Sequence, residues 1–133
     1  MKKKLTTQPR VEDQRYYRKI GKLKKSVADA IGKECTNIYI SDNHLKHIFI
    51  KHKNEIAQVG LTPLAFVDLV VGKYNRIYKG RRSALQLVVW NGSAKVVIIE
   101  LNLALENNFY EVVTATIKRK SNLKDHDLLW KKK

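Results

Sequence analysis

The stretch ALQLVVWNGSAKVVIIEL, residues 84–101, decides the fold class because it has the pattern of two strands joined by a turn. Both halves are rich in β-branched and long apolar side chains, which favour half-buried strands. Asn91-Gly92 is a residue pair that two-residue hairpin loops prefer. If these two residues form the whole loop, Leu87 pairs with Val96. The core face of the hairpin is then expected to carry Leu85, Leu87, Val89, Val96 and Ile98.

Two further strands flank this hairpin. NRIYKG (75–80) and FYEVVTATIK (109–118) have strand composition, and the connections KGRRS and ENN have turn composition. Alternation along the last strand groups Tyr110, Val112, Thr114, Thr116 and Lys118. We therefore expect an α+β fold with N-terminal helices packed on one face of a four-stranded antiparallel meander sheet. The other face would carry hydroxyl and basic groups, and such a long shallow surface suits a strand of RNA.

Residues 1–35 are expected to form a basic arm and one amphipathic helix. Apolar side chains recur every three or four residues between 11 and 33, and Gly32 is a plausible helix stop. They are Tyr16, Ile20, Leu23, Val27 and Ile31. The α+β domain then covers residues 36–133.

Two more helices are expected after the short strand NIYIS (37–41). Ser41 or Asp42 can cap a helix that runs to about Val59 and stops at Gly60. Thr62 can cap the next helix, which begins with Pro63 and ends near Gly72.

Charge is the strongest compositional signal. Twenty-seven Lys and Arg against twelve Asp and Glu give a net charge of +15. A field of this size favours polyanions, so nucleic acid is the expected target and a lysine-rich solubilising surface is the alternative. The longest apolar runs are interrupted by Asp68 and Glu100, so no membrane span is expected. A single cysteine, Cys35, and a start at Met1 without a secretory signal favour the cytoplasm.

Three of the four histidines lie in HLKHIFIKH, residues 44–52. They could bind a metal, fill a core or transfer protons. A metal at His44 and His47 lacks a cysteine pair or a suitably spaced carboxylate. On a helical wheel His52 falls in the middle of an apolar arc, so we expect it to point toward the sheet. The arc consists of Leu45, Ile48, Phe49, Ile56 and Val59.

Proton transfer is the interpretation that accounts for the neighbouring residue types. Cleaving RNA without a metal needs a base for the 2′-hydroxyl, an acid for the departing 5′-oxygen and positive charge beside the phosphate. Imidazole suits both proton transfers, since its reference pKa is about 6.5. His47 and His52 offer it. Positive charge and hydroxyl groups are available at Lys79, Arg81, Arg82, Thr114, Thr116 and Ser121.

The string IYISDNHLKHIFIKH (38–52), with its His47-Ile48-x-x-Lys51-His52 core, resembles the histidine-bearing helix of phage-associated nuclease domains. These belong to the barnase/EndoU/colicin E5/D/RelE-like (BECR) ribonuclease fold group. The resemblance extends over about residues 36–130 and includes the IYKG turn and the ending FYEVVTATIKRKSNLKDHDLLW. It implies a metal-independent endoribonuclease that forms a 2′,3′-cyclic phosphate, needs no cofactor and acts as a toxin or conflict effector.

The resemblance also implies roles for single residues. The catalytic histidine falls on His52, with His47 as the second motif position, and the basic strand residue falls on Lys79. The hydroxyl near the end of the last strand falls on Thr114 or Thr116. The RNA-binding residues expected beside them are Lys51, Arg81, Arg82, Trp90, Lys95, Lys118 and Arg119.

RNA, with transfer RNA first, is the expected partner. A basic cytotoxic ribonuclease would also need an acidic immunity or antitoxin protein, which electrostatic steering would make fast-binding. Two other functions stay open. One is a nucleic-acid-binding module without chemistry, in which Trp90, Tyr74 and Tyr78 stack bases. The other is a phage structural or interaction protein that has the fold alone.

Overall fold

The structure is a computed structural model, and it describes residues 17–33, 35–104 and 109–133. Its regular elements, in chain order, are β1 (Tyr17–Lys22), α1 (Lys25–Ile31), β2 (Asn37–Ser41), α2 (Asp42–Ala57), α3 (Pro63–Lys73), β3 (Arg76–Lys79), β4 (Leu85–Val89), β5 (Lys95–Ala104), β6 (Phe109–Arg119) and β7 (Leu128–Lys131). Short 3-10 turns follow β3 and β6.

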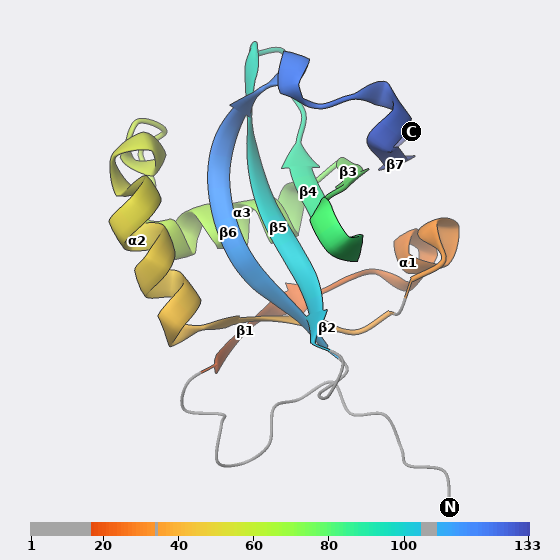
Figure 1. The fold of residues 1–133 in the computed structure, drawn as a ribbon, viewed down its shortest axis with the longest axis horizontal. Coiled ribbons are helices and arrows are strands. Elements are labelled where there is room, and N and C mark those ends of the chain that lie inside the picture. Colours follow the sequence, from red (N-terminus) through yellow and green to blue (C-terminus); the bar gives the residue numbers. More distant parts are fainter. Residues whose placement is uncertain (1–16, 34, 105–108) are drawn as a thin grey trace, which may run out of the picture.

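The described strands form one mixed sheet in the order β1-β2-β6-β5-β4-β3-β7 (Figure 1). β2 and β6 run parallel, and the other neighbours run antiparallel. The prediction of a four-stranded antiparallel meander is therefore wrong. The four expected strands are present as β3 to β6, but the sheet is extended by β2 and β1 at one side and by β7 at the other. β2 is the short strand expected over residues 37–41, but its place in the sheet depends on long-range pairing with β6, and β1 and β7 likewise depend on long-range pairing with β2 and β3.

The prediction of a single helix over residues 11–33 is also wrong for residues 17–33, the part that the structure describes. β1 and the short helix α1 replace it, and residues 11–16 lie outside the described range. β1 is held by antiparallel pairing with β2, and Leu23 N donates to Thr36 O at 3.0 Å. Leu23, Val27 and Ala28 are buried in the main core. This segment is thus part of the fold and not an appended arm.

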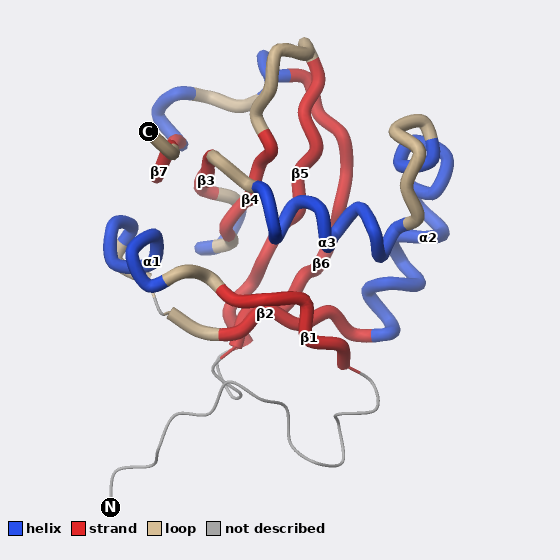
Figure 2. The backbone as a smooth tube through the Cα atoms, turned by 180° about the vertical axis from the view of Figure 1, so that it is seen from behind, coloured by secondary structure: helices blue, strands red, loops and turns tan. Residues whose placement is uncertain are grey.

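The helices cover the sheet unequally. α3 crosses one face of the strands, whereas α2 lies beside β6, and both views agree on this arrangement (Figures 1 and 2). The main core lies on the α3 face. Its buried side chains include Ile38, Ile48, Ile56, Phe66, Ile77, Leu85, Leu87 and Ile99.

The caps that position α2 and α3 confirm the sequence prediction. Ser41 Oγ accepts the backbone N–H of His44 at 3.1 Å, and Thr62 Oγ1 accepts that of Ala65 at 3.2 Å. Each hydroxyl satisfies a backbone donor that the first helical turn leaves free.

The β4–β5 hairpin has a different register from the expected one. Val89 pairs with Val97 and Leu87 with Ile99, so the shift is three residues. The cause is the Asn75 side chain, which accepts from Trp90 N at 2.7 Å and donates to Trp90 O at 2.8 Å, drawing Trp90 out of the strand. An odd shift exchanges the faces of a strand. Val96 and Ile98 therefore leave the main core and join a smaller one on the opposite face, with Tyr78, Val88 and Leu123.

A β-bulge in β6 overturns the simple alternation expected there. Glu100 pairs with Thr114 while Leu101 pairs with Val112, so Val113 is an extra residue. Tyr110 and Val112 lie on the main-core face together with Ala115 and Ile117. Thr114, Thr116 and Lys118 consequently alternate onto the opposite face, which we call the open face.

No helix in the described ranges is long and apolar enough to cross a membrane.

Candidate functional site

Helix α2 presents a narrower buried face than its sequence suggested. Ile48 and Ile56 are fully buried, but Phe49 and Val59 are 49% and 45% exposed. The cause is that α2 packs beside one strand, β6, and not across the breadth of the sheet. The His52 side chain lies at the margin of this contact and is 27% exposed. It is a partly accessible group and not a core histidine.

A single carboxylate joins His52 to the sheet. Glu55 Oε1 lies 2.7 Å from His52 Nδ1, and it accepts the hydroxyl hydrogen of Thr116 at 2.9 Å. Glu55 is one helical turn beyond His52, so both side chains lie on the same helix face. Within the described residues, His52 Nε2 has no hydrogen-bond partner. The chain of contacts therefore fixes the imidazole through one nitrogen and leaves the other free for proton transfer.

A hollow of about 530 Å³ opens on the open face beside this chain of contacts, and we call it the first hollow. The side chains that give it its chemistry are Lys79, Arg81, Glu100, Thr114, Thr116, Lys118 and Asp127. The hollow thus holds three cations, two carboxylates and two hydroxyls. The β3 loop supplies Lys79 and Arg81, and the bulge in β6 directs both threonines to this face.

Sequence reasoning missed both carboxylates of the first hollow, Glu100 in β5 and Asp127 in the C-terminal segment, as functional residues. Glu100 lies opposite Thr114 in the sheet. A Cβ built on Gly80 would approach Glu100 Oε2 to 2.9 Å and Ala84 Cβ to 3.1 Å. Glycine at position 80 therefore allows the β3 loop to close over the carboxylate. The only sequence signal was a charge inside an otherwise apolar strand, VVIIEL.

Two neighbouring hollows extend this surface. The second, of about 600 Å³, is lined by Arg81, Arg82, Glu100 and Asn102. The third, of about 520 Å³, lies between the end of α2 and the β5–β6 hairpin. Its charged lining residues are Glu55, Lys95, Lys118 and Arg119. The predicted basic residues Arg82, Lys95 and Arg119 thus border the same region as the first hollow.

Four predicted residues line none of the three hollows. His52 is joined to them through Glu55, which lines the third, and through Thr116, which lines the first. His47 and Lys51 are exposed on α2 and line none of the three hollows, although the His47 and His52 ring centroids are 6.4 Å apart. Trp90 is covered by cations: Arg76 Cζ lies 3.6 Å and Lys120 Nζ 4.6 Å from its ring centroid.

The two tyrosines proposed for base stacking are in the interior. Tyr74 is 8% and Tyr78 1% exposed, so neither ring offers a face to a base.

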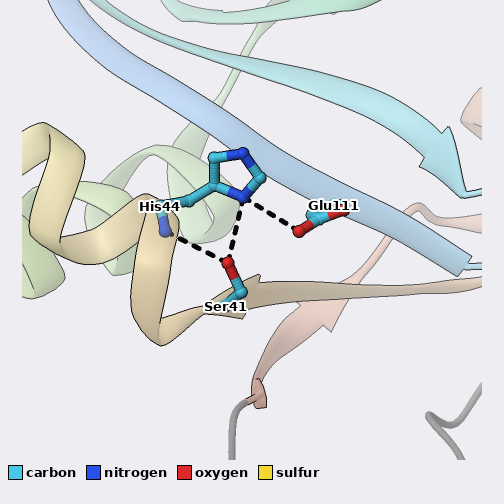
Figure 3. A network of polar contacts seen from close by, with 3 residues as sticks. All are labelled: Ser41, His44 and Glu111. Atoms are coloured by element: carbon cyan, nitrogen blue, oxygen red, sulfur yellow. Dashed lines mark hydrogen bonds and ion pairs between the residues drawn. The ribbon is translucent and has the colours of Figure 1, made fainter. Parts of the chain in front are cut away.

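His44 has its own cluster at the other end of α2, shown in Figure 3. Its Nδ1 lies 3.0 Å from Ser41 Oγ and 2.9 Å from Glu111 Oε2. This is not a nucleophilic triad, because serine and carboxylate meet the same ring nitrogen, and a triad needs one on each. The cluster instead ties the start of α2 to β6.

Among the described residues, no three His, Cys, Asp or Glu side chains gather in a way that could hold a metal ion. No family model, curated protein or solved structure matches the chain. The resemblance to BECR ribonucleases therefore stays a prediction, and the site has to be judged by its geometry.

Proposed function

We propose that the protein is a metal-independent endoribonuclease that acts on cytoplasmic RNA, transfer RNA being the first substrate to test. The observation that carries the proposal is the Glu55 carboxylate, which bridges His52 on α2 and Thr116 on β6 at the rim of a cationic hollow. Carboxylate-oriented imidazole beside fixed positive charge is the combination that phosphodiester transfer requires without a metal.

The reaction assigns a task to each group. The ribose 2′-oxygen attacks the adjacent phosphorus as its proton leaves to a base. The bond from phosphorus to the 5′-oxygen breaks as that oxygen receives a proton from an acid. The products are a 2′,3′-cyclic phosphate and a 5′-hydroxyl. His52 Nε2 is proposed as one proton-transfer group, because Glu55 and Thr116 join it to the hollows that hold the cations. The Glu100 carboxylate is proposed as the other, because it lines the first hollow together with Lys79, Arg81 and Lys118.

The surrounding residues support the charged transition state. Lys79, Arg81 and Lys118 would stabilise negative charge on the phosphoryl oxygens. Thr114 would donate a hydrogen bond to them. Thr116 donates its hydroxyl hydrogen to Glu55, so we assign it a positioning role. His47 is proposed as a lesser contributor, since no side chain orients it toward the hollow.

The test is cleavage of total transfer RNA in EDTA. Wild-type protein should give discrete fragments with 2′,3′-cyclic phosphate ends, and His52→Ala should cut the rate by at least about a hundredfold. His126→Ala is the histidine control, because His126 is exposed in the C-terminal segment and its ion-pair partner is Asp127, which takes no part in the contacts among His52, Glu55 and Thr116. Fragments that vanish in EDTA, or equal rates for wild type and His52→Ala, would reject the proposal.

A nucleic-acid-binding module without chemistry is the second candidate. The observation that favours it is the grouping of cations over three adjoining hollows, which would hold a polyanion whether or not protons move. Binding without fragments in the same assay would select it. Under either function, an acidic inhibitory protein is the proposed partner of this basic surface.

A further inference from the structure

The three hollows adjoin one another. The first and second share Arg81 and Glu100, and the first and third share Lys118 and Asn122. Together they form one trough, defined here by its six cations Lys79, Arg81, Arg82, Lys95, Lys118 and Arg119. The trough begins at the β3 loop, crosses the open face and passes around β6 to the end of α2.

The span of the trough along the sheet can be measured on β5. Asn102 lines the hollow at one end and Lys95 the hollow at the other. Seven residues separate them, which at about 3.3 Å per residue is about 23 Å. A nucleic-acid strand advances about 3.4 Å per nucleotide when stacked, so this span along β5 corresponds to about seven stacked nucleotides, and to fewer if the strand is extended.

The lining of the trough is suited to backbone and base edges and not to base faces. The three hollows contain six cations but no aromatic side chain among their described lining residues. Each hollow has an amide that can donate to and accept from a base edge: Gln86 in the first, Asn102 in the second and Asn91 in the third. Base edges are free in single strands, whereas the side chains could reach few of them in an A-form duplex.

We infer that the trough binds a single-stranded RNA segment of about four to seven nucleotides, with its phosphates on the six cations and its bases against the amides. This inference rests on RNA as the partner in the proposed function, but it does not depend on cleavage. It defines the substrate as an unpaired loop or end and not as a helical stem.

The test uses fluorescence anisotropy with labelled 2′-O-methyl RNA, which lacks the attacking hydroxyl and cannot be cleaved. Affinity should rise with length from two nucleotides and level off between about four and seven. A duplex of twelve base pairs should bind more weakly than the single strand of the same length. An affinity that keeps rising to twelve nucleotides, or equal affinity for the duplex, would overturn the inference.

A second experiment removes charge at each of the two ends of the trough. With six phosphate contacts, log affinity should fall against log salt with a slope of about −4. Arg81→Gln with Arg82→Gln, and separately Lys95→Gln with Arg119→Gln, should each make the slope shallower by about 1.4. The matched control is Lys46→Gln with Lys73→Gln, two exposed lysines outside the hollows. A control change as large as either end pair would contradict the trough.

The two proposals fail separately. Length-limited single-strand binding by a protein that releases no fragments would retain the trough and remove the ribonuclease. If the protein cleaves RNA but its affinity shows no length plateau and does not respond to the double variants at the two ends, the ribonuclease would be retained and the trough removed.

Discussion

The two ends of helix α2 hold the same three kinds of side chain and use them differently. At the start, His44 meets the hydroxyl of Ser41 and the carboxylate of Glu111. At the end, His52 meets the carboxylate of Glu55, which in turn accepts from Thr116.

At the first cluster the hydroxyl caps the helix, and neither Ser41 nor His44 lines any of the three hollows. At the second cluster, Glu55 and Thr116 line hollows that also contain five cations, Lys79, Arg81, Lys95, Lys118 and Arg119. The comparison teaches that the charged surroundings, and not the combination of residue types, distinguish a candidate catalytic histidine from a structural one.

Among the residues that contact the two histidines, the carboxylate of the second cluster should have the largest effect when it is removed. Glu55→Ala frees the imidazole to turn, so kcat for RNA cleavage should fall at least about tenfold, with KM near the wild-type value. Single-turnover and steady-state kinetics measure the two parameters. A change confined to KM would assign Glu55 to RNA binding and not to positioning His52.

Removing the carboxylate of the first cluster should act on stability instead. Glu111→Ala deletes the contact that joins the start of α2 to β6, and the free energy of unfolding should fall by about 1–2 kcal/mol, since both groups are partly exposed. Urea denaturation provides the measurement. The variant should cleave RNA at the wild-type rate, and a hundredfold loss of activity in a folded protein would contradict the distinction between the clusters.

The two hydroxyls sharpen the comparison at a smaller scale. Ser41→Ala removes the N-cap of α2 and should cost about 1 kcal/mol of unfolding free energy. Thr116→Val removes the hydroxyl that orients Glu55, and it should lower the cleavage rate a few-fold with little change in stability. Thermal unfolding and rate measurements on both variants check the pair. Equal behaviour of the two would remove the contrast between the clusters.

The smallest expected effect is at Tyr74, a buried polar group that belongs to neither cluster. Its hydroxyl has no hydrogen-bond partner in the described part of the chain. Burial raises the pKa of its phenol above the ordinary value of 10.0, and the nearby Lys24 backbone offsets part of this rise without a full hydrogen bond. Tyr74→Phe should leave the unfolding free energy within about 1 kcal/mol of wild type, toward higher stability.

The pH dependence at Tyr74 follows from the sign of that shift. The folded state favours the neutral phenol, so its contribution is complete below the unfolded pKa near 10.0 and is lost as pH rises through the higher folded pKa. Wild type should therefore lose more stability than Tyr74→Phe across that alkaline range. Denaturation curves at several pH values test this, and parallel losses would show that the phenol does not ionise with unfolding.

Local signals predicted the histidine helix well. Ser41, Thr62 and Pro63 act within one turn of the helices that they begin, so their effect is readable from neighbouring residues. The sequence did not predict β1, because Ile20 and Leu23 match helical spacing by chance. Pairing with β2 makes this segment a strand. The sequence did not predict β7, because LLWK lies in a lysine-rich end of the chain and forms a strand by pairing with β3.

The candidate site was only partly readable. The sequence predicted the basic residues of β3, β5 and β6. Their positions on the sheet also depend on the β4–β5 register, in which Asn75 takes part, and on the β6 bulge, in which Val113 is the extra residue. Glu55 could have been found, since it follows His52 by three positions on a helix. Glu100 could not have been assigned to the site without the cross-strand partner Thr114.

The most direct test of the account measures RNA cleavage and thermal unfolding together for His52→Ala and His44→Ala. The account predicts a crossed result. His52→Ala should lose cleavage by at least about a hundredfold and keep the wild-type unfolding temperature, while His44→Ala should unfold at lower temperature and still cleave. Loss of cleavage in both, or in His44→Ala alone, would contradict the claim that the chemistry belongs to the cationic end of α2.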